Sequence, residues 1–141
     1  MSTSSRKPAS QGARGANAAP TEFDIWLQET FDREGSFTAL VVLVRIGELK
    51  VDPLASTFVN FIGDEVRWPA IVTLFAGSGK TWDGAVFFPV LDSGGLLLNA
   101  EARSRLRALE AKVREDRLTI NTGAFFDAWG RRMKVEEVLP N

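Results

Sequence analysis

The 141-residue sequence contains no histidine, no cysteine and no tyrosine. Without an imidazole base, the chain cannot form a Ser-His-Asp or Cys-His catalytic arrangement. Structural zinc sites, disulfides, iron–sulfur clusters and haem held by Cys or His are excluded because their ligands are missing. Carboxylates, lysine, a Ser or Thr activated by lysine, and Mg²⁺ held by oxygen atoms remain available for catalysis. No strong pattern in the chain indicates any of these, so we assign no catalytic residue, no metal ligand and no cofactor.

Long apolar runs are also missing. The longest uninterrupted run, Ala39–Val44, ends at Arg45, whereas a helix needs roughly 20 apolar residues to cross a bilayer. Residues 1–20 lack the apolar stretch that forms the centre of a secretory signal peptide. We therefore expect a cytoplasmic protein that does not use a membrane as a partner.

Residues 1–20 have almost no large apolar side chains and are rich in Ser, Ala, Gly and Pro. Three of the 17 basic residues (Arg6, Lys7 and Arg14) and none of the 18 acidic residues lie there, giving +3 for this segment and −4 for the rest. Such a segment cannot bury enough surface to offset its conformational entropy. We expect a disordered basic tail over residues 1–20 and a single domain over residues 21–141. The tail could be an inert terminus, an electrostatic arm for a polyanion, or a transit peptide.

The composition as a whole is that of a folded protein. Hydrophobic residues make up 45% of the chain, and ten Phe and four Trp are available to fill a core. Outside the tail the net charge is mildly negative, whereas a general nucleic-acid binder is usually basic over one face.

A helix is predicted from Thr21 to Gly35. Thr21 and Asp24 have the spacing of a capping box, and a glycine commonly follows the last residue of a helix. The run Thr38–Ile46 of β-branched residues and leucines predicts a buried central strand. Gly47-Glu48 is then typical of a tight turn into a second short strand.

Asp52-Pro53 is typical of the N-cap and the first residue of a helix, which predicts a helix over residues 54–66. The strand propensity of Ser56–Val59 and the interruption at Gly63 leave a strand open as the alternative.

The later part of the chain predicts two strands around a glycine-rich loop, a helix capped by Asn99, and three short strands. Their residues are 68–75 and 82–91, 100–116, and 118–121, 124–129 and 133–138. Pro89 indicates that the strand containing it lies at an edge or ends there. This order predicts an α+β fold, a small single domain whose antiparallel or mixed β-sheet is packed by about three helices on one face.

Gly77-Ser78-Gly79-Lys80-Thr81 resembles the end of a phosphate-binding P-loop. The full pattern GxxxxGK[ST] needs a glycine where the chain has Leu74, and it must open a helix, whereas a strand is predicted next. The segment could instead be a hairpin loop with a solvated lysine, or a backbone nest for an anion beside Lys80. A nucleotide- or anion-binding regulator, with Asp83 as an acid, a base or a Mg²⁺ ligand, is the third functional hypothesis.

The helix predicted over residues 100–116 carries a row of arginines. Arg103, Arg107 and Arg114 share one face and could meet nucleic-acid phosphates or an acidic partner. They could equally belong to a solvated surface, because (i, i+4) pairs of opposite charge, such as Glu101–Arg105, also occur on this helix.

Aromatic residues stand beside paired arginines near the end of the chain. Phe125, Phe126 and Trp129, followed by Arg131 and Arg132, fit a single-stranded nucleic-acid platform or a sheet that covers a core. Alternation along a strand places the two phenylalanines on opposite faces, which weakens the platform interpretation.

The four tryptophans, Trp26, Trp68, Trp82 and Trp129, are candidate interface residues, and we expect some of them to form one partly exposed patch. The favoured function is a non-catalytic intracellular binding or adaptor domain that acts through a protein partner or as a homodimer. The alternative is a nucleic-acid-associated protein that uses the basic tail, the arginine row or the arginine pair.

Overall fold

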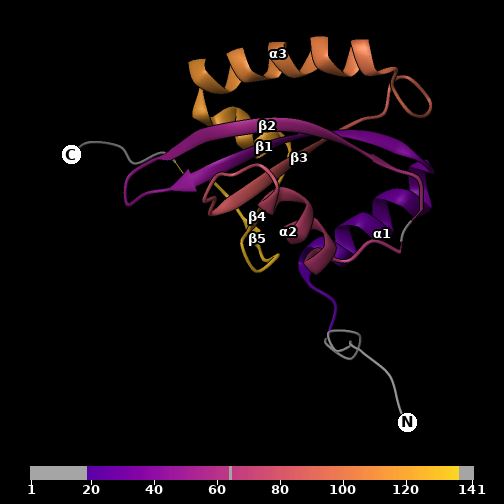
Figure 1. Ribbon diagram of the computed structural model, residues 1–141, viewed down its shortest axis with the longest axis horizontal. Helices are drawn as coiled ribbons and strands as arrows, with labels where there is room; N and C mark the ends of the chain where they lie inside the picture. The colour runs from indigo at the N-terminus through magenta and orange to yellow at the C-terminus, as the bar shows by residue number, and fades with distance from the viewer. Residues whose placement is uncertain (1–18, 64, 137–141) are drawn as a thin grey trace.

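The computed structural model describes residues 19–63 and 65–136 and shows a β-sheet held between helices (Figure 1). The predicted tail falls almost entirely on residues 1–18, which lie outside the described residues. The sheet has five strands in the order β2-β1-β3-β4-β5, and all neighbouring pairs are antiparallel. The predicted α+β class, with an antiparallel sheet and about three helices, is therefore confirmed.

Helices and strands alternate along the chain in an irregular order: α1 (Glu22–Glu34), β1 (Phe37–Ile46), β2 (Val51–Phe61), α2 (Trp68–Ala76), β3 (Gly84–Val90), α3 (Asn99–Glu115), the 3-10 helix η2 (Arg117–Thr122), β4 (Ala124–Asp127) and β5 (Arg132–Met133). The helices α1 and α2 lie on one face of the sheet, and α3 lies on the other (Figure 1). The expectation that all helices cover one face is therefore wrong, and the sheet is a central layer buried from both sides.

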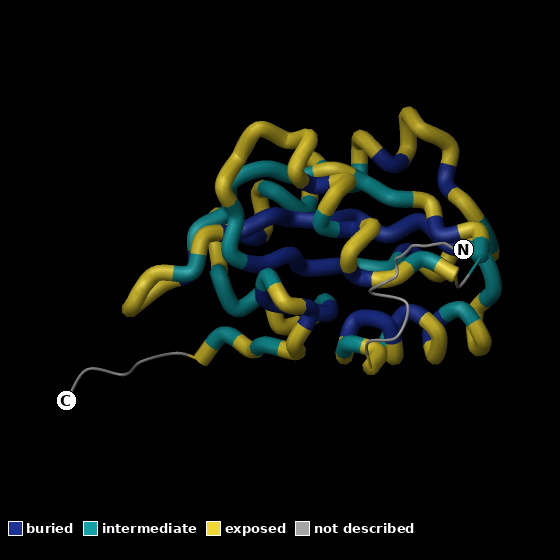
Figure 2. Tube along the Cα trace, turned by 60° about the horizontal axis from the view of Figure 1, so that its bottom comes forward, coloured by how far each residue is buried: buried dark blue, intermediate teal, exposed yellow. Residues whose placement is uncertain are grey.

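The central strand β1 has the residue pattern that this position requires. Its side chains alternate between the two cores, Ala39, Val41 and Leu43 toward α1 and α2, and Leu40, Val42 and Val44 toward α3. Both sets are buried, as the dark tubes in the middle of the molecule show (Figure 2). Fully burying a valine or leucine contributes about 1.5–3 kcal/mol, so this strand can stabilise both layers at once.

The helix α1 begins and ends where the sequence predicts. Thr21 Oγ1 accepts a hydrogen bond of 3.1 Å from the Asp24 amide, and Asp24 Oδ2 accepts one of 3.0 Å from the Thr21 amide. Gly35 has a φ of 75° and donates its amide to the Phe31 carbonyl oxygen, which ends the helix. The capped helix places Phe23 in the centre of the first core, where it contacts the rings of Trp26, Phe61, Trp68, Phe87 and Phe126.

Residues 54–61 of the segment predicted as a helix belong to the edge strand β2, which is the alternative that the strand propensity of Ser56–Val59 left open. Asp52 and Pro53 lie within this strand and cap no helix. A β-bulge explains why the proline is tolerated: β1 pairs with Pro53 and then with Ala55, which leaves Leu54 as the extra residue. Proline is accepted in strands at edges and at bulges because it cannot donate to a ladder, and β2 offers both conditions.

The connection between β1 and β2 is longer than the predicted two-residue turn. It spans residues 47–50 and is closed by a hydrogen bond of 2.8 Å from the Gly47 amide to the Lys50 carbonyl oxygen.

The strand predicted over residues 68–75 is wrong, because this segment forms the helix α2. Pro69 lies in the first turn, where a missing amide proton costs little. Trp68, Ile71 and Phe75 are buried at helical spacing on one face. The strand predicted over residues 82–91 forms as β3. It is not an edge strand, because β1 and β4 pair with its two sides, but Pro89 lies beyond the residues that pair with β4.

The C-terminal third departs from prediction in its short elements. The helix α3 forms, but its N-cap is Leu98 instead of Asn99. Residues 118–121 belong to η2 and not to a strand. In place of the strand predicted over residues 133–138, the structure has the two-residue strand β5. Residues 137 and 138 of the predicted strand lie outside the described residues. Of the helices in the described part of the chain, none is long and apolar enough to cross a membrane.

Candidate functional site

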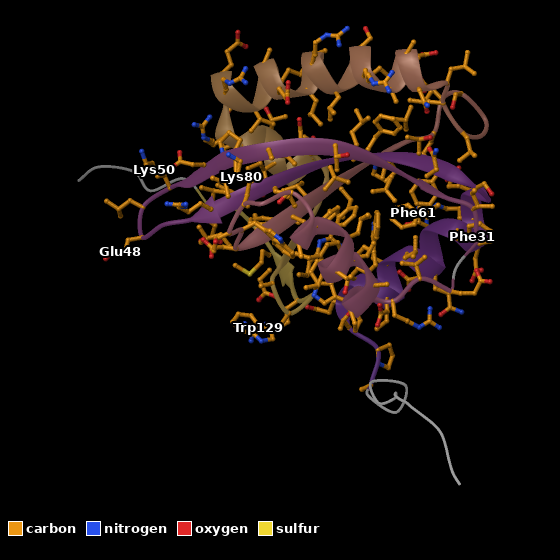
Figure 3. All side chains as sticks on the ribbon, in the orientation of Figure 1. Phe31, Glu48, Lys50, Phe61, Lys80 and Trp129 are labelled. Carbon is orange, nitrogen blue, oxygen red and sulfur yellow. The ribbon has the colours of Figure 1, made fainter. Side chains whose placement is uncertain are left out.

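The Gly77–Thr81 loop lies in the reverse order to a P-loop. It follows the C-terminal end of α2 and leads to β3, whereas a P-loop leads from a strand into the N-terminus of a helix. The end of α2 carries a partial negative charge, which disfavours a bound anion. Lys80 is exposed at this end of the molecule (Figure 3).

Four backbone amides of this loop, those of residues 77–80, already donate hydrogen bonds within the protein. Those of Gly77, Ser78 and Gly79 donate to carbonyl oxygens at the end of α2. The Lys80 amide donates to Ser78 Oγ at 3.1 Å. An anion nest needs amides that point outward and are unpaired, so this geometry gives no support to nucleotide or anion binding by the loop.

The neighbouring Asp83 has a structural contact. Its Oδ2 accepts a hydrogen bond of 2.8 Å from the Ile46 amide, and its own amide donates to the Val44 carbonyl oxygen at 2.9 Å. The side chain therefore fixes the start of β3 against the end of β1. Within the described residues, no group of three carboxylates converges as a metal site would require.

The four tryptophans do not gather in one exposed patch. Trp68 is buried, and Trp26 and Trp82 pack against the core between the sheet and the helices α1 and α2. Trp129 alone among them is largely exposed, with 70% of its surface accessible. Figure 3 shows it at the outer end of the β4–β5 turn, pointing away from the body of the protein. Of the four tryptophans, Trp129 is therefore the one that is accessible to another molecule.

The carboxylate of Asp127 holds the turn that carries Trp129. Asp127 Oδ1 accepts hydrogen bonds from the amides of Trp129, at 2.9 Å, and Arg131, at 3.0 Å. Its Oδ2 accepts a third bond, of 2.7 Å, from the Arg131 Nε. Asp127 is only 6% exposed, so these contacts satisfy a carboxylate that would be costly to bury without partners. The turn is thus organised around a single side chain.

Gly130 brings the same turn into close contact with α1 and α2. It has a φ of 79°, and a Cβ atom there would lie 2.9 Å from Trp68 Cγ and 3.0 Å from Thr21 Cβ. Its carbonyl oxygen accepts the Phe23 amide at 3.1 Å, and the Ala128 carbonyl oxygen accepts Trp68 Nε1 at 2.9 Å. The exposed indole of Trp129 is therefore presented by a fixed turn and not by a loose loop.

The two arginines next to this turn have different contacts. The Arg131 guanidinium lies 5.2 Å from the centroid of the Trp129 ring, so the two side chains form an exposed cation–π pair. Arg132 lies over the buried Phe126 at 5.4 Å, and its amide donates to Glu22 at 2.6 Å. As predicted, Phe125 and Phe126 pack into different cores, on opposite faces of the sheet.

The predicted arginine row lies on an exposed flank of α3. Arg103, Arg107 and Arg114 are exposed and form no ion pair within the described part of the chain. Arg105 points to the other flank, where Glu101 and Asp92 pair with it and raise its pKa. The row and the arginine pair Arg131–Arg132 lie on different sides of the sheet, so the structure does not join them into one basic surface (Figure 1).

A further exposed apolar group was not predicted from the sequence. The last residues of β2 and β3 both pair with the first residues of β1, so the two strands end at the same side of the sheet. The chain segments that follow these two ends carry exposed aliphatic side chains: Ile62 after β2, and Leu91, Leu96 and Leu98 after β3. The run of three leucines at residues 96–98 in a loop is the signal that could have revealed it. Only Leu97 of that run is buried, and its amide donates to Thr38 Oγ1.

A hollow at the N-terminal ends of α1 and α2 has a volume of about 700 Å³. Asp24 is part of its wall, but its two carboxylate oxygens accept the amides of Thr21 and Trp68. The carboxylate therefore stabilises the two helix ends and is not turned toward a ligand.

Comparison with protein-family models, curated proteins and solved structures gives no match to this chain.

Proposed function

We propose that this chain is a non-catalytic, intracellular protein-binding domain, an adaptor that contacts a partner through the turn carrying Trp129 and Arg131. The exposure of Trp129 carries the proposal. A loose loop would lose backbone conformational entropy on binding, whereas the contacts of Asp127 and Gly130 fix the backbone of this turn in advance.

The chemistry of the turn also suggests the kind of surface it would meet. Tryptophan and arginine are the residues most enriched at positions that dominate binding energies in protein interfaces. The indole offers a large apolar surface, and the guanidinium stacked beside it adds a positive charge. A partner with an apolar pocket bordered by carboxylates would complement both groups.

Comparative capture from the native host tests the proposal. The wild-type chain is compared with Trp129→Ala and with Leu49→Ala, a control in the exposed β1–β2 loop, whose Glu48 and Lys50 lie apart from Trp129 in Figure 3. A partner should bind the wild type and the control, and its affinity for Trp129→Ala should fall at least about thirtyfold, as for other dominant interface residues. Identical binding by all three chains would remove the turn from the interface.

Association with nucleic acid is the second candidate, favoured by the exposed arginine row on α3, which has no ion pair with any described residue. A tryptophan-fluorescence titration with single- and double-stranded oligonucleotides at low and high salt tests it, because the exposed Trp129 reports contacts at the turn. Phosphate contacts predict an affinity that falls steeply as salt rises. Loss of binding in Arg131→Ala/Arg132→Ala would place the site at the turn, and loss in Arg103→Ala/Arg107→Ala would place it on α3.

A further inference from the structure

The strand β2 forms one edge of the sheet, and among residues 19–63 and 65–136 no strand pairs with its outer side. It spans eleven residues, and no charged residue occurs from Pro53 to Phe61. Natural sheets usually protect such an edge with lysine, with bulges or with a covering segment. Here the bulge at Leu54 interrupts the first part of the strand only, which leaves Ala55–Phe61 as a regular edge.

The arginine row of α3 lies beside this edge. Arg103, Arg107, Glu110 and Arg114 follow one another at helical spacing on one side of the helix. Glu110 accepts a hydrogen bond from the Ser56 hydroxyl of β2. Glu110 and Arg114 also line a small hollow of about 80 Å³ together with Pro53 and Leu54. This flank of α3 therefore faces the β2 side of the sheet.

The row also runs along the strand. Phe58 packs against the same cluster as Leu106, in the middle of α3, and Val51 belongs to the same cluster as Val113, near the end of the helix. At about 1.5 Å per helical residue, Arg103 and Arg114 are separated by about 16 Å, which is the length of about five extended residues. An added strand would thus have the three arginines beside it, with Glu110 between Arg107 and Arg114 already hydrogen-bonded to Ser56.

We propose that the edge of β2 binds an extended acidic segment of a partner protein as a sixth strand. The backbone of that segment would pair with the free amides and carbonyls of β2. Its alternate side chains would point to the α3 face of the sheet, where carboxylates meet Arg103, Arg107 and Arg114. This surface is separate from the turn carrying Trp129, because that turn follows β4 at the other side of the sheet.

The charges favour this occupant over a second copy of the chain. Antiparallel pairing of two β2 edges would place both α3 helices on the same face of one continuous sheet. The two arginine flanks would then face each other, and like charges across an interface are unfavourable. An acidic peptide turns the same three unpaired cations into attractive contacts.

A labelled peptide that alternates threonine and glutamate tests the proposal, with a threonine–glutamine peptide as its neutral control. Fluorescence anisotropy of the full-length chain should show binding of the acidic peptide that weakens about tenfold in Arg103→Ala/Arg107→Ala/Arg114→Ala. The matched control is Arg33→Ala/Lys80→Ala/Lys134→Ala, which removes the same charge from exposed positions elsewhere and should bind like the wild type. Equal weakening in both triple variants, or no binding of the acidic peptide, would overturn the proposal.

Hydrogen exchange locates the peptide independently of affinity. The amides of residues 55–61 should exchange more slowly when the acidic peptide is bound, since a new strand protects them. Peptide binding without this protection would overturn the proposal. Two other results would also overturn it: a free chain that is already a dimer with these amides protected, and an oligonucleotide that displaces the peptide and binds more tightly. Trp129→Ala should leave peptide binding unchanged. Failure of peptide binding at β2 can therefore be distinguished from failure of the protein-binding function proposed for the turn that carries Trp129.

Discussion

The indole Nε1 of Trp68 donates a hydrogen bond of 2.9 Å to the carbonyl oxygen of Ala128, 60 residues later in the chain. This bond joins the first turn of α2 to the turn that follows β4. Gly130 lies against the same indole and against Thr21. One buried tryptophan thus fixes the position of another, Trp129, which is exposed one residue beyond the bond.

Replacing Gly130 by alanine should destabilise the protein by about 2–4 kcal/mol, because the new Cβ atom meets Trp68 and the φ of 79° is unfavourable for alanine. The matched control is Gly79→Ala, since Gly79 has a φ of 75° but no atom within 4 Å of the added Cβ. The control should lose only about 1 kcal/mol. Urea unfolding of both variants measures the difference, and equal losses would mean that the close contact with Trp68 is not important.

Asp24→Ala should reduce the free energy of unfolding by about 2–3 kcal/mol, because the carboxylate accepts the amides of both Thr21 and Trp68 and so serves two helix N-termini. Asp24→Asn, which retains one acceptor oxygen, should lie between alanine and the wild type. Asp32→Ala, at an exposed position of the same helix, should change stability by less than about 0.5 kcal/mol. Thermal or urea unfolding of the three variants provides the measurement, and a loss in Asp24→Ala no greater than in Asp32→Ala would contradict the double cap.

Arg117→Ala should cost about 1–2 kcal/mol and loosen the end of α3. The guanidinium donates to the carbonyl oxygens of Val51 at 2.9 Å and Val113 at 2.7 Å, and so ties α3 to the start of β2. Arg114→Ala is the control, because that exposed side chain has no ion pair among the described residues and its loss should leave stability almost unchanged. Hydrogen exchange of the last turn of α3 should quicken only in Arg117→Ala. If both variants behave alike, the bridge between helix and strand has no energetic role.

The elements that local signals specify could be predicted from the sequence. The capping box of Thr21 and Asp24 and the final Gly35 define α1, and the apolar run of β1 is the pattern of a strand buried on both faces. The segments that depend on distant partners were predicted wrongly or, for residues 54–66, left open between helix and strand. Asp52-Pro53 carries a local helix signal, but pairing with β1 and the bulge at Leu54 place it in a strand.

The candidate site was predictable only as a set of residue types. Strand alternation would have placed Trp129 on the same face as Phe125, but the three hydrogen bonds to Asp127 end the strand and turn the indole outward. The separation of the arginine row from the arginine pair depends on which face of the sheet α3 covers, and no local pattern in the helix specifies that face.

Photo-cross-linking in the native host, with a photoreactive amino acid placed at residue 129 or at residue 49, tests the central claim most directly. Both positions are highly exposed, so they differ in location and not in accessibility. The account predicts that residue 129 cross-links to a distinct protein, that residue 49 does not, and that Arg131→Ala reduces the yield. The same products from both positions, or nucleic acid as the main product at residue 129, would contradict a protein-binding role for this turn.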